Sequence, residues 1–140
     1  MKLIFKGFKT DTKKRIIRFN DMLFDYFEIE KHEKLSITFA ISRNKEIYGE
    51  CSQVGKWKYL IRINENRLHG NYDLIETLAH ELVHLRQFVN GDLRFSKMGN
   101  VVTFKGERFR AKNMCYYKVP WEVEAYGLQY GAVLHCIGSD

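Results

Sequence analysis

The spacing of apolar and polar positions divides the first half of the chain into one helix and several strands. Apolar side chains recur at helical intervals from residue 11 to residue 27, which predicts an amphipathic helix with a basic beginning and an aromatic end. Residues 35–41 and 57–64 alternate apolar and polar positions, as half-buried strands do, and residues 46–53 repeat that pattern more weakly. These three strands predict an antiparallel meander, while residues 2–8 fit either a short strand or an extended arm.

The clearest helix in the sequence is predicted at residues 73–89. Leucines and other apolar residues form a continuous stripe along it, and polar residues gather on the opposite face. Asp73, followed three residues later by Glu76, resembles a capping box at its start. Gly91 stands just past its end, where a glycine often closes a helix. Such a helix can bury its apolar back in a core and turn its polar face toward a cleft.

The last third of the chain predicts a hairpin and a final helix. Residues 101–104 and 108–110 are strand-like segments separated by a short turn. Pro120 fits the first position of a helix over residues 120–135. Because the chain shows no repeat and no linker, residues 1–140 are predicted to form a single α+β domain. In it, an N-terminal helix, an antiparallel sheet of three to four strands and the polar-faced helix precede the C-terminal helix.

The composition favours a folded cytoplasmic protein. Of the 140 residues, 45% are hydrophobic and 29% are charged, which suits a packed domain and argues against disorder. No segment approaches the roughly 20 apolar residues that span a bilayer, and the apolar run at the N-terminus is too short for a secretion signal. The three cysteines lack paired spacing, which favours reduced thiols over disulfides or a cysteine zinc site. We therefore expect a cytoplasmic location and no membrane association.

The net charge of +6 is concentrated near the N-terminus. The first twenty residues contain seven lysines and arginines against the single acid Asp11. Such a segment is typical of a solvated helix face that keeps a protein soluble. It also fits a weak association with nucleic acid through the basic N-terminal helix. The sequence leaves both interpretations open.

The motif His80-Glu81-Leu82-Val83-His84 lies on the clearest predicted helix. Residues four apart stand one turn apart on the same helix face, so His80 and His84 can bind one metal ion together. Two imidazoles at this spacing are typical of zinc sites. Glu81 is rotated partly off their line, where its carboxylate can contact a water on the metal without becoming a ligand. The sequence therefore predicts one Zn²⁺ per chain.

A catalytic zinc ion needs a third protein ligand from elsewhere in the chain. Glu122 and Glu124 in the final helix are the candidates, and only one can face the metal because they lie about 200° apart around the helix axis. Glu122 is favoured, since Ala125 and Gln129 share its face and the small alanine allows close approach. Glu124 remains the alternative. The other histidines are expected to face solvent or to be poorly placed: His32, His69 and His135.

The motif and the final helix together resemble a known class of enzymes. Glu122-Val-Glu-Ala125 matches the pattern E-x-x-A, so the chain resembles the gluzincin branch of the H-E-x-x-H metallopeptidases, as in their ImmA/IrrE-like and CaaX-protease-like members. Residues 76–84 also resemble the SprT-like proteins, whose third ligand is typically histidine, and small metallopeptidases of bacteria and their phages. Tyr126 stands where many relatives carry aspartate. The resemblance implies a zincin-like domain that hydrolyses peptide bonds.

The resemblance also implies a mechanism. Zinc activates a water, Glu81 takes its proton and passes it to the leaving amine, and the protein or peptide substrate pairs with the strand before the metal helix, residues 57–64. A further donor must stabilise the oxyanion, and the candidates precede the last helix: Tyr116, Tyr117 and Arg108. Two alternatives remain, a SprT-like protease associated with nucleic acid and a zinc-containing binding module without activity. The intact Glu81 argues against the second.

Overall fold

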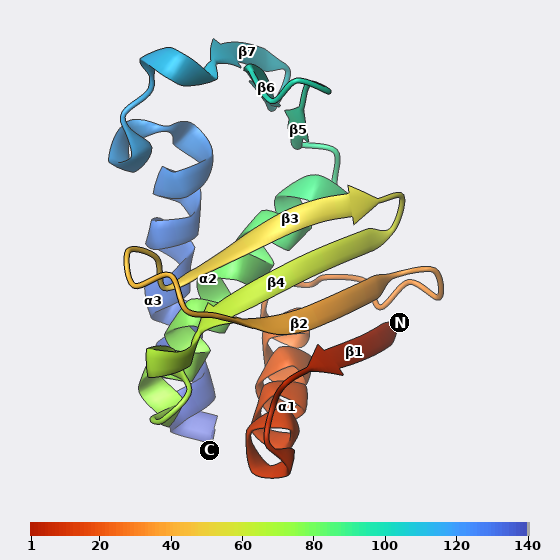
Figure 1. Cartoon of the computed structure of the whole chain (residues 1–140), viewed down its shortest axis with the longest axis vertical. Helices are drawn as coiled ribbons and strands as arrows, with labels where there is room; N and C mark the ends of the chain where they lie inside the picture. The colour runs from red at the N-terminus through yellow and green to blue at the C-terminus, as the bar shows by residue number, and fades with distance from the viewer. Residues whose placement is uncertain (140) are drawn as a thin grey trace.

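Three α-helices and two β-sheets form the described part of the chain, residues 1–139, in a computed structural model (Figure 1). The side chains of residues 113, 117 and 139 lie outside this description. The predicted α+β class is confirmed. The helices and strands follow in this order: β1 (Lys2–Lys6), α1 (Thr10–Tyr26), β2 (Ser36–Ser42), β3 (Gly49–Gly55), β4 (Lys58–Asn64), α2 (Asn71–Val89), β5 (Leu93–Phe95), β6 (Val101–Phe104), β7 (Glu107–Arg110) and α3 (Pro120–Ser139).

The large sheet is mixed, so the prediction of an antiparallel meander is wrong. Its strands lie in the order β1-β2-β4-β3. β1 runs parallel to β2 and β2 parallel to β4, and only β3 is antiparallel to its neighbour β4. α1 is the crossover between β1 and β2, which makes β1 an edge strand rather than a free arm. Apolar and polar positions alternate with the same period in both orientations, so the pattern alone did not reveal the strand directions.

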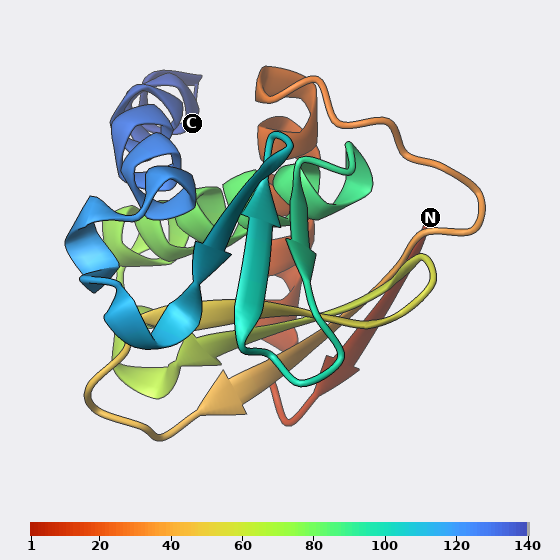
Figure 2. The ribbon, with the colours of Figure 1, turned by 90° about the horizontal axis from the view of Figure 1, so that it is seen from above.

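The hydrophobic core lies between one face of the large sheet and the helices, which Figures 1 and 2 show gathered on the same side. Ile37 and Phe39 of β2 point into this core. Their register partners on β4, Tyr59 and Ile61, point the same way, and all four side chains are buried. Burying each of these large side chains contributes roughly 1.5–3 kcal/mol. α1 and α2 cover the layer with further buried side chains: Phe19, Leu23, Leu74 and Leu78.

α2 is buried on its polar face as well as on its apolar face, because α3 packs along it. Small buried residues of α3, Ala125 and Ala132, allow the two helices to approach closely. A second close approach holds α3 to α1, since a Cβ atom added at Gly131 would lie 2.8 Å from the hydroxyl of Tyr26. The polar residues of α2 that this packing buries are Thr77, His80, Glu81, His84 and Gln87.

The two ends of α2 differ in how well the sequence predicted them. The helix begins at Asn71 without a side-chain cap, so the predicted capping box is wrong. Arg67 instead forms ion pairs with both Asp73 and Glu76 and draws their carboxylates away from the helix terminus. At the other end Gly91 adopts a φ of 76°, a left-handed conformation that favours glycine, as predicted.

The small sheet is an antiparallel arrangement of β5, β6 and β7. Its β6–β7 hairpin was predicted from the sequence, and the turn residues Lys105 and Gly106 both have positive φ, as a type I′ turn requires. β5 was not predicted, because three residues are too few to show an alternation. Rings on the inner face anchor this sheet to the helices: Phe95 lies 5.8 Å from Phe88, and Phe104 and Phe109 lie 6.0 and 5.6 Å from Trp121 between centroids.

Two expectations from the composition concern membranes and disulfides. Among residues 1–139, no helix is both long enough and apolar enough to span a bilayer. No disulfide joins Cys51, Cys115 and Cys136 within this part of the chain.

Candidate metal centre

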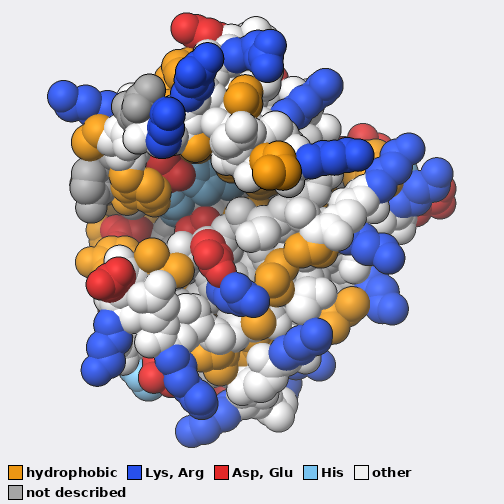
Figure 3. Space-filling model, turned by 45° about the horizontal axis from the view of Figure 1, so that its top comes forward, with side chains coloured by type: hydrophobic (Ala, Val, Ile, Leu, Met, Phe, Trp, Pro, Cys, Tyr) orange, Lys and Arg blue, Asp and Glu red, His pale blue; other side chains and the backbone are white. Residues whose placement is uncertain are grey.

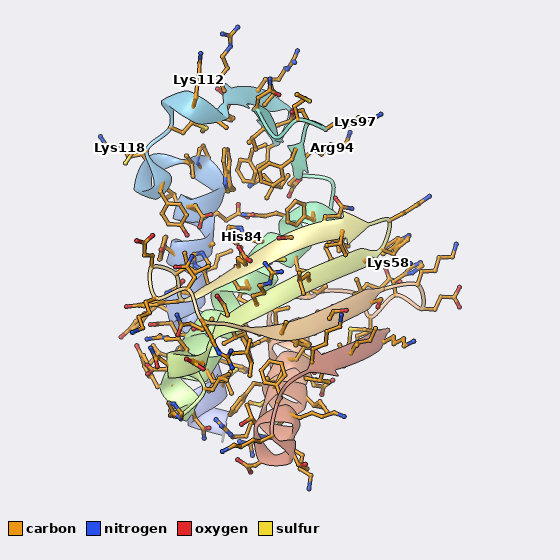
Figure 4. All side chains as sticks on the ribbon, in the orientation of Figure 1. Lys58, His84, Arg94, Lys97, Lys112 and Lys118 are labelled. Carbon is orange, nitrogen blue, oxygen red and sulfur yellow. The ribbon has the colours of Figure 1, made fainter. Side chains whose placement is uncertain are left out.

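The two histidines of the motif come together on the buried polar face of α2. His80 and His84 stand one turn apart, and their Nε2 atoms are separated by 3.2 Å. Their side chains are only 10% and 8% exposed to solvent, respectively. In Figure 4 the label of His84 lies near the β3 edge of the large sheet, below the small sheet. The helix therefore directs both imidazoles to one point between the two sheets.

α3 brings Glu122 to the same point. Its Oε1 atom lies 2.9 Å from Nε2 of His80 and 3.1 Å from Nε2 of His84. Ligand atoms about 2.0 Å from a tetrahedral zinc ion lie about 3.3 Å apart, so these atoms are spaced nearly as such an ion requires. Although burial acts in the opposite direction, contacts with both histidines lower the pKa of Glu122 to about 2. Within the described chain, this is the one group of three side chains placed to share a metal ion.

Gln87 determines which nitrogen of His84 carries a hydrogen. Its amide nitrogen donates to the carbonyl of Trp121 at 3.0 Å and to Oε1 of Glu124 at 3.1 Å. The amide oxygen of Gln87 therefore faces Nδ1 of His84, 2.8 Å away, and an oxygen of this kind only accepts. It follows that Nδ1 of His84 is the donor, so in the neutral ring Nε2 presents a lone pair toward Glu122.

Gln129 of α3 repeats this arrangement at the other histidine. Its Oε1 atom lies 2.6 Å from Nδ1 of His80. With both Nδ1 atoms acting as donors, two imidazole lone pairs and the carboxylate of Glu122 converge in a buried space. Converging acceptors are unfavourable without a positive charge between them. A divalent metal ion supplies that charge.

Glu124, the alternative third ligand, points away from the histidines. Its Oε1 atom accepts from Gln87, and its Oε2 atom lies 2.8 Å from the ammonium group of Lys105 in the β6–β7 turn. Although burial opposes the effect, the hydrogen bonds from Lys105 and Gln87 lower the pKa of Glu124. Glu124 therefore supports the amide that orients His84, and the structure brings Glu122 rather than Glu124 to the metal group.

Glu81 lies beside the metal group without belonging to it. Its buried carboxyl faces the start of β3, where a Cβ atom added at Gly49 would lie 3.1 Å from Oε2 of Glu81 and 2.9 Å from the carbonyl oxygen of Arg62. Gly49 thus lets the strand pass close to the carboxyl, a role that the sequence analysis missed. Burial is the strongest influence on this group and raises the pKa of Glu81 to about 8, and the negative charge of Glu122 adds to the effect.

Two tyrosines adjoin the metal group on the side of His80. The ring of Tyr126 packs 4.6 Å from the ring of His80. Tyr116 lies 6.4 Å from Tyr126 between ring centroids. Burial, the charge of Glu122 and a hydrogen bond with Tyr126 raise the pKa of Tyr116, so its hydroxyl keeps its hydrogen at neutral pH.

Only one of the three candidate oxyanion donors is placed at the cleft by the described side chains. Tyr116 lines the cleft on both sides of the metal group. Arg108 belongs to β7 and lines neither side. The side chain of Tyr117 lies outside the described residues.

The other three histidines lie away from the metal group. His32 stacks on Trp57 with 4.1 Å between ring centroids, and His135 lies 5.1 Å from Tyr26. His69 is exposed after the short 3₁₀ turn that precedes α2. No third histidine therefore competes with Glu122.

A cleft borders β3 on both sides of the metal group, and Figure 3 shows histidine and acidic side chains in a hollow of this face. The side next to His80 has a volume of about 490 Å³, and its lining includes the polar residues Glu76, Thr77 and Gln129. The side next to His84 has about 220 Å³, and its lining includes the apolar residues Phe88, Leu93, Phe95 and Trp121.

The strand that borders this cleft is β3, not the strand that the sequence analysis predicted. Residues 57–64 correspond to β4, which pairs with β2 on one side and with β3 on the other. Its backbone groups are therefore already used within the sheet. In the sheet, β3 lies next to β4 and forms the edge. The other side of β3 can therefore pair with another chain. The prediction failed because strand order cannot be read from the order of elements along the chain.

Comparison of the chain with protein-family models, curated proteins and solved structures found no match. The site itself is a buried group of two histidines from one helix and a glutamate from a later helix, an arrangement consistent with a zincin-like metal site.

Replacing Gln87 or Gln129 by alanine should weaken zinc binding by about 10- to 100-fold, the usual effect of losing a partner that orients a ligand. Gln53→Ala is the matched control, because this glutamine is exposed on β3 away from the site. Competition with a chromophoric chelator measures the dissociation constants. Unchanged affinity in Gln87→Ala and Gln129→Ala would contradict the role assigned to the two amides.

Glu81 should make the metal-free protein less stable as the pH rises. Its pKa is about 8 in the folded chain against an ordinary value of 4.5, so between these values the folded state holds a proton that the unfolded state has lost. The stability that Glu81 contributes is complete below pH 4.5 and is lost progressively as the pH approaches about 8. Glu81→Gln removes this titration, so the variant should gain stability over wild type across that range.

Urea unfolding of chelator-treated protein at several pH values measures the difference, with the exposed Glu33→Gln as the control. If Glu81→Gln and wild type show parallel pH profiles, the raised pKa of Glu81 is refuted.

Proposed function

We propose that this protein is a zinc-dependent peptidase. The observation that carries the proposal is the convergence of His80, His84 and Glu122, with Glu81 buried beside them and outside the ligand set. Imidazole nitrogens favour zinc over magnesium or calcium, and three protein ligands are the number found in catalytic rather than structural zinc sites. Zinc, when bound there, lowers the pKa of a water and polarises the carbonyl of a substrate.

Glu81 is the proposed general base. It lines both sides of the cleft, so its carboxyl can reach a reacting group placed between them. A carboxylate whose pKa lies nearer to neutrality than usual accepts a proton from water more readily and can return it to the leaving amine. Tyr116 is the proposed oxyanion donor, because its hydroxyl is protonated and its side chain lines the cleft.

The proposed substrate is a protein or peptide segment lying along β3. An edge strand presents backbone N–H and C=O groups that can pair with an extended peptide. β3 and the loop before it border both halves of the cleft, through Ile47 and Gly49. A peptide paired with this edge would pass the metal group with its side chains directed alternately toward the cleft and away from it.

We also propose a cytoplasmic location. The three cysteines form no disulfide within the described residues, and Cys115 is exposed, which suits a reducing compartment.

Glu81→Gln should keep the bound zinc and the fold but lower peptidase activity by about 10²-fold or more, the usual scale for a general base. Glutamine retains the shape and hydrogen bonding of the side chain but has no basic carboxylate. The assay compares degradation of an unfolded casein by wild type and variant at equal zinc content, with Glu33→Gln as a control of the same chemistry at an exposed site. Equal, chelator-sensitive activity in both proteins would remove Glu81 from the mechanism. Zinc-loaded wild type without activity on casein or on a mixed peptide library would count against a peptidase.

A further inference from the structure

The small sheet has one apolar face and one basic face. Inward-pointing residues of its strands pack on α2 and α3, so the residues between them point outward. Arg94 of β5 and Arg108 of β7 both lie opposite Thr103 of β6, and Arg110 lies opposite Val101. Because paired residues of antiparallel strands point to the same side, the arginines share the outer face, defined by Arg94, Arg108 and Arg110.

The backbone positions of the three arginines lie close together. Neighbouring strands lie about 4.8 Å apart, so Arg94 and Arg108 are separated by two such steps, about 10 Å between backbones. Arg108 and Arg110 are two residues apart along one strand, about 7 Å. All three side chains are exposed. The sheet therefore carries three positive charges on one surface, close enough together to repel one another.

This part of the chain is a second basic segment besides the N-terminal one. Residues 92–118 contain seven lysines and arginines and two acids, a local charge of 7 − 2 = +5, against 7 − 1 = +6 in the first twenty residues. Among the described residues, only Lys105 of these seven forms an ion pair, with Glu124. Figure 3 shows basic side chains over the top of the molecule, and Figure 4 labels four of them around the small sheet: Arg94, Lys97, Lys112 and Lys118.

The basic residues of α1 are more engaged within the fold than those of the small sheet. Arg15 forms an ion pair with Asp11 and donates to the carbonyl of Leu68 at 2.6 Å. Lys13 lies over the ring of Phe5. Arg15 and Lys13 of α1 are thus held by contacts within the fold, whereas no ion pair holds Arg94, Arg108 or Arg110 among the described residues.

We propose that the outer arginine face of the small sheet binds the phosphate backbone of nucleic acid. The planar guanidinium group presents paired N–H donors that match a phosphate, and arginine forms such contacts better than lysine. A polyanion relieves the repulsion among the three arginines and gains the free energy of counterion release. Lys97 and Lys112 extend the surface beyond the sheet. This binding requires neither zinc nor peptidase activity.

The test is binding of a fluorescein-labelled oligothymidine strand by full-length protein, measured by anisotropy between about 50 and 200 mM salt. The variant Arg94→Ser/Arg108→Ser/Arg110→Ser removes three charges from the proposed face. The matched control Lys9→Ser/Lys13→Ser/Lys14→Ser removes three charges from the start of α1, Lys9 being the residue just before the helix, so both variants have a net charge of 6 − 3 = +3. We expect the arginine variant to bind at least about 10-fold more weakly, with a salt slope smaller by about 2, which is three contacts at about 0.7 each. The α1 control should stay within about 2-fold of wild type.

A second variant, Lys97→Ser/Lys112→Ser, leaves the strands untouched and should lower the slope by about 1 if the face extends as proposed. Equal losses in the arginine variant and the α1 control would show that binding follows net charge or the N-terminal helix, and would overturn the proposal. Wild type that fails to bind the strand at low salt would do the same. Competition by poly-glutamate as strong as by the oligonucleotide would assign the face to acidic polypeptides instead.

Discussion

The packing of α3 against the polar face of α2 is the interaction on which the rest of this structure depends. It removes two histidines and a glutamate from water, and desolvation of such groups is unfavourable unless each one finds a partner. α3 contacts the two histidines through Glu122 and Gln129, and the carbonyl of Trp121 accepts from Gln87 of α2. The close approach of the two helices therefore creates the metal group. Because the ligands stand on two helices rather than on loops, the site is preorganised.

Several parts of this arrangement could be predicted from the sequence because they depend on helical periodicity. The spacing of His80 and His84 places both on one face, and the spacing from Glu122 to Gln129 does the same on α3. The hairpin was predictable because its turn residues Lys105 and Gly106 carry a local signal. These predictions needed no knowledge of how distant segments are arranged.

The remaining features depend on such distant arrangements. Strand alternation reports which side chains are buried and not in which direction a strand runs, so the mixed sheet and the edge position of β3 were not predicted. The closeness of Gly49 to Glu81 arises only when β3 crosses α2 in space. The capping box failed for a related reason, because Arg67 lies close enough to Asp73 and Glu76 to compete for their carboxylates.

The small sheet links the metal group to the basic surface. Its inner rings hold Trp121, which directly precedes Glu122, and its turn residue Lys105 holds Glu124, which in turn binds Gln87 behind His84. The small sheet thus has a basic outer face and at the same time supports the metal group through its inner rings and its turn. Removal of the sheet should consequently disturb the site even though no metal ligand lies on it.

The central claim is that Glu122, and not its neighbour Glu124, completes a metal site with His80 and His84. The most direct test is the zinc content of purified wild type, Glu122→Ala and Glu124→Ala after dialysis against a weak chelator, measured by elemental analysis. Wild type should contain about one zinc ion per chain. Glu122→Ala should lose most of this zinc, and Glu124→Ala should retain it. Zinc retained by Glu122→Ala and lost by Glu124→Ala, or wild type that takes up no zinc, would contradict the account.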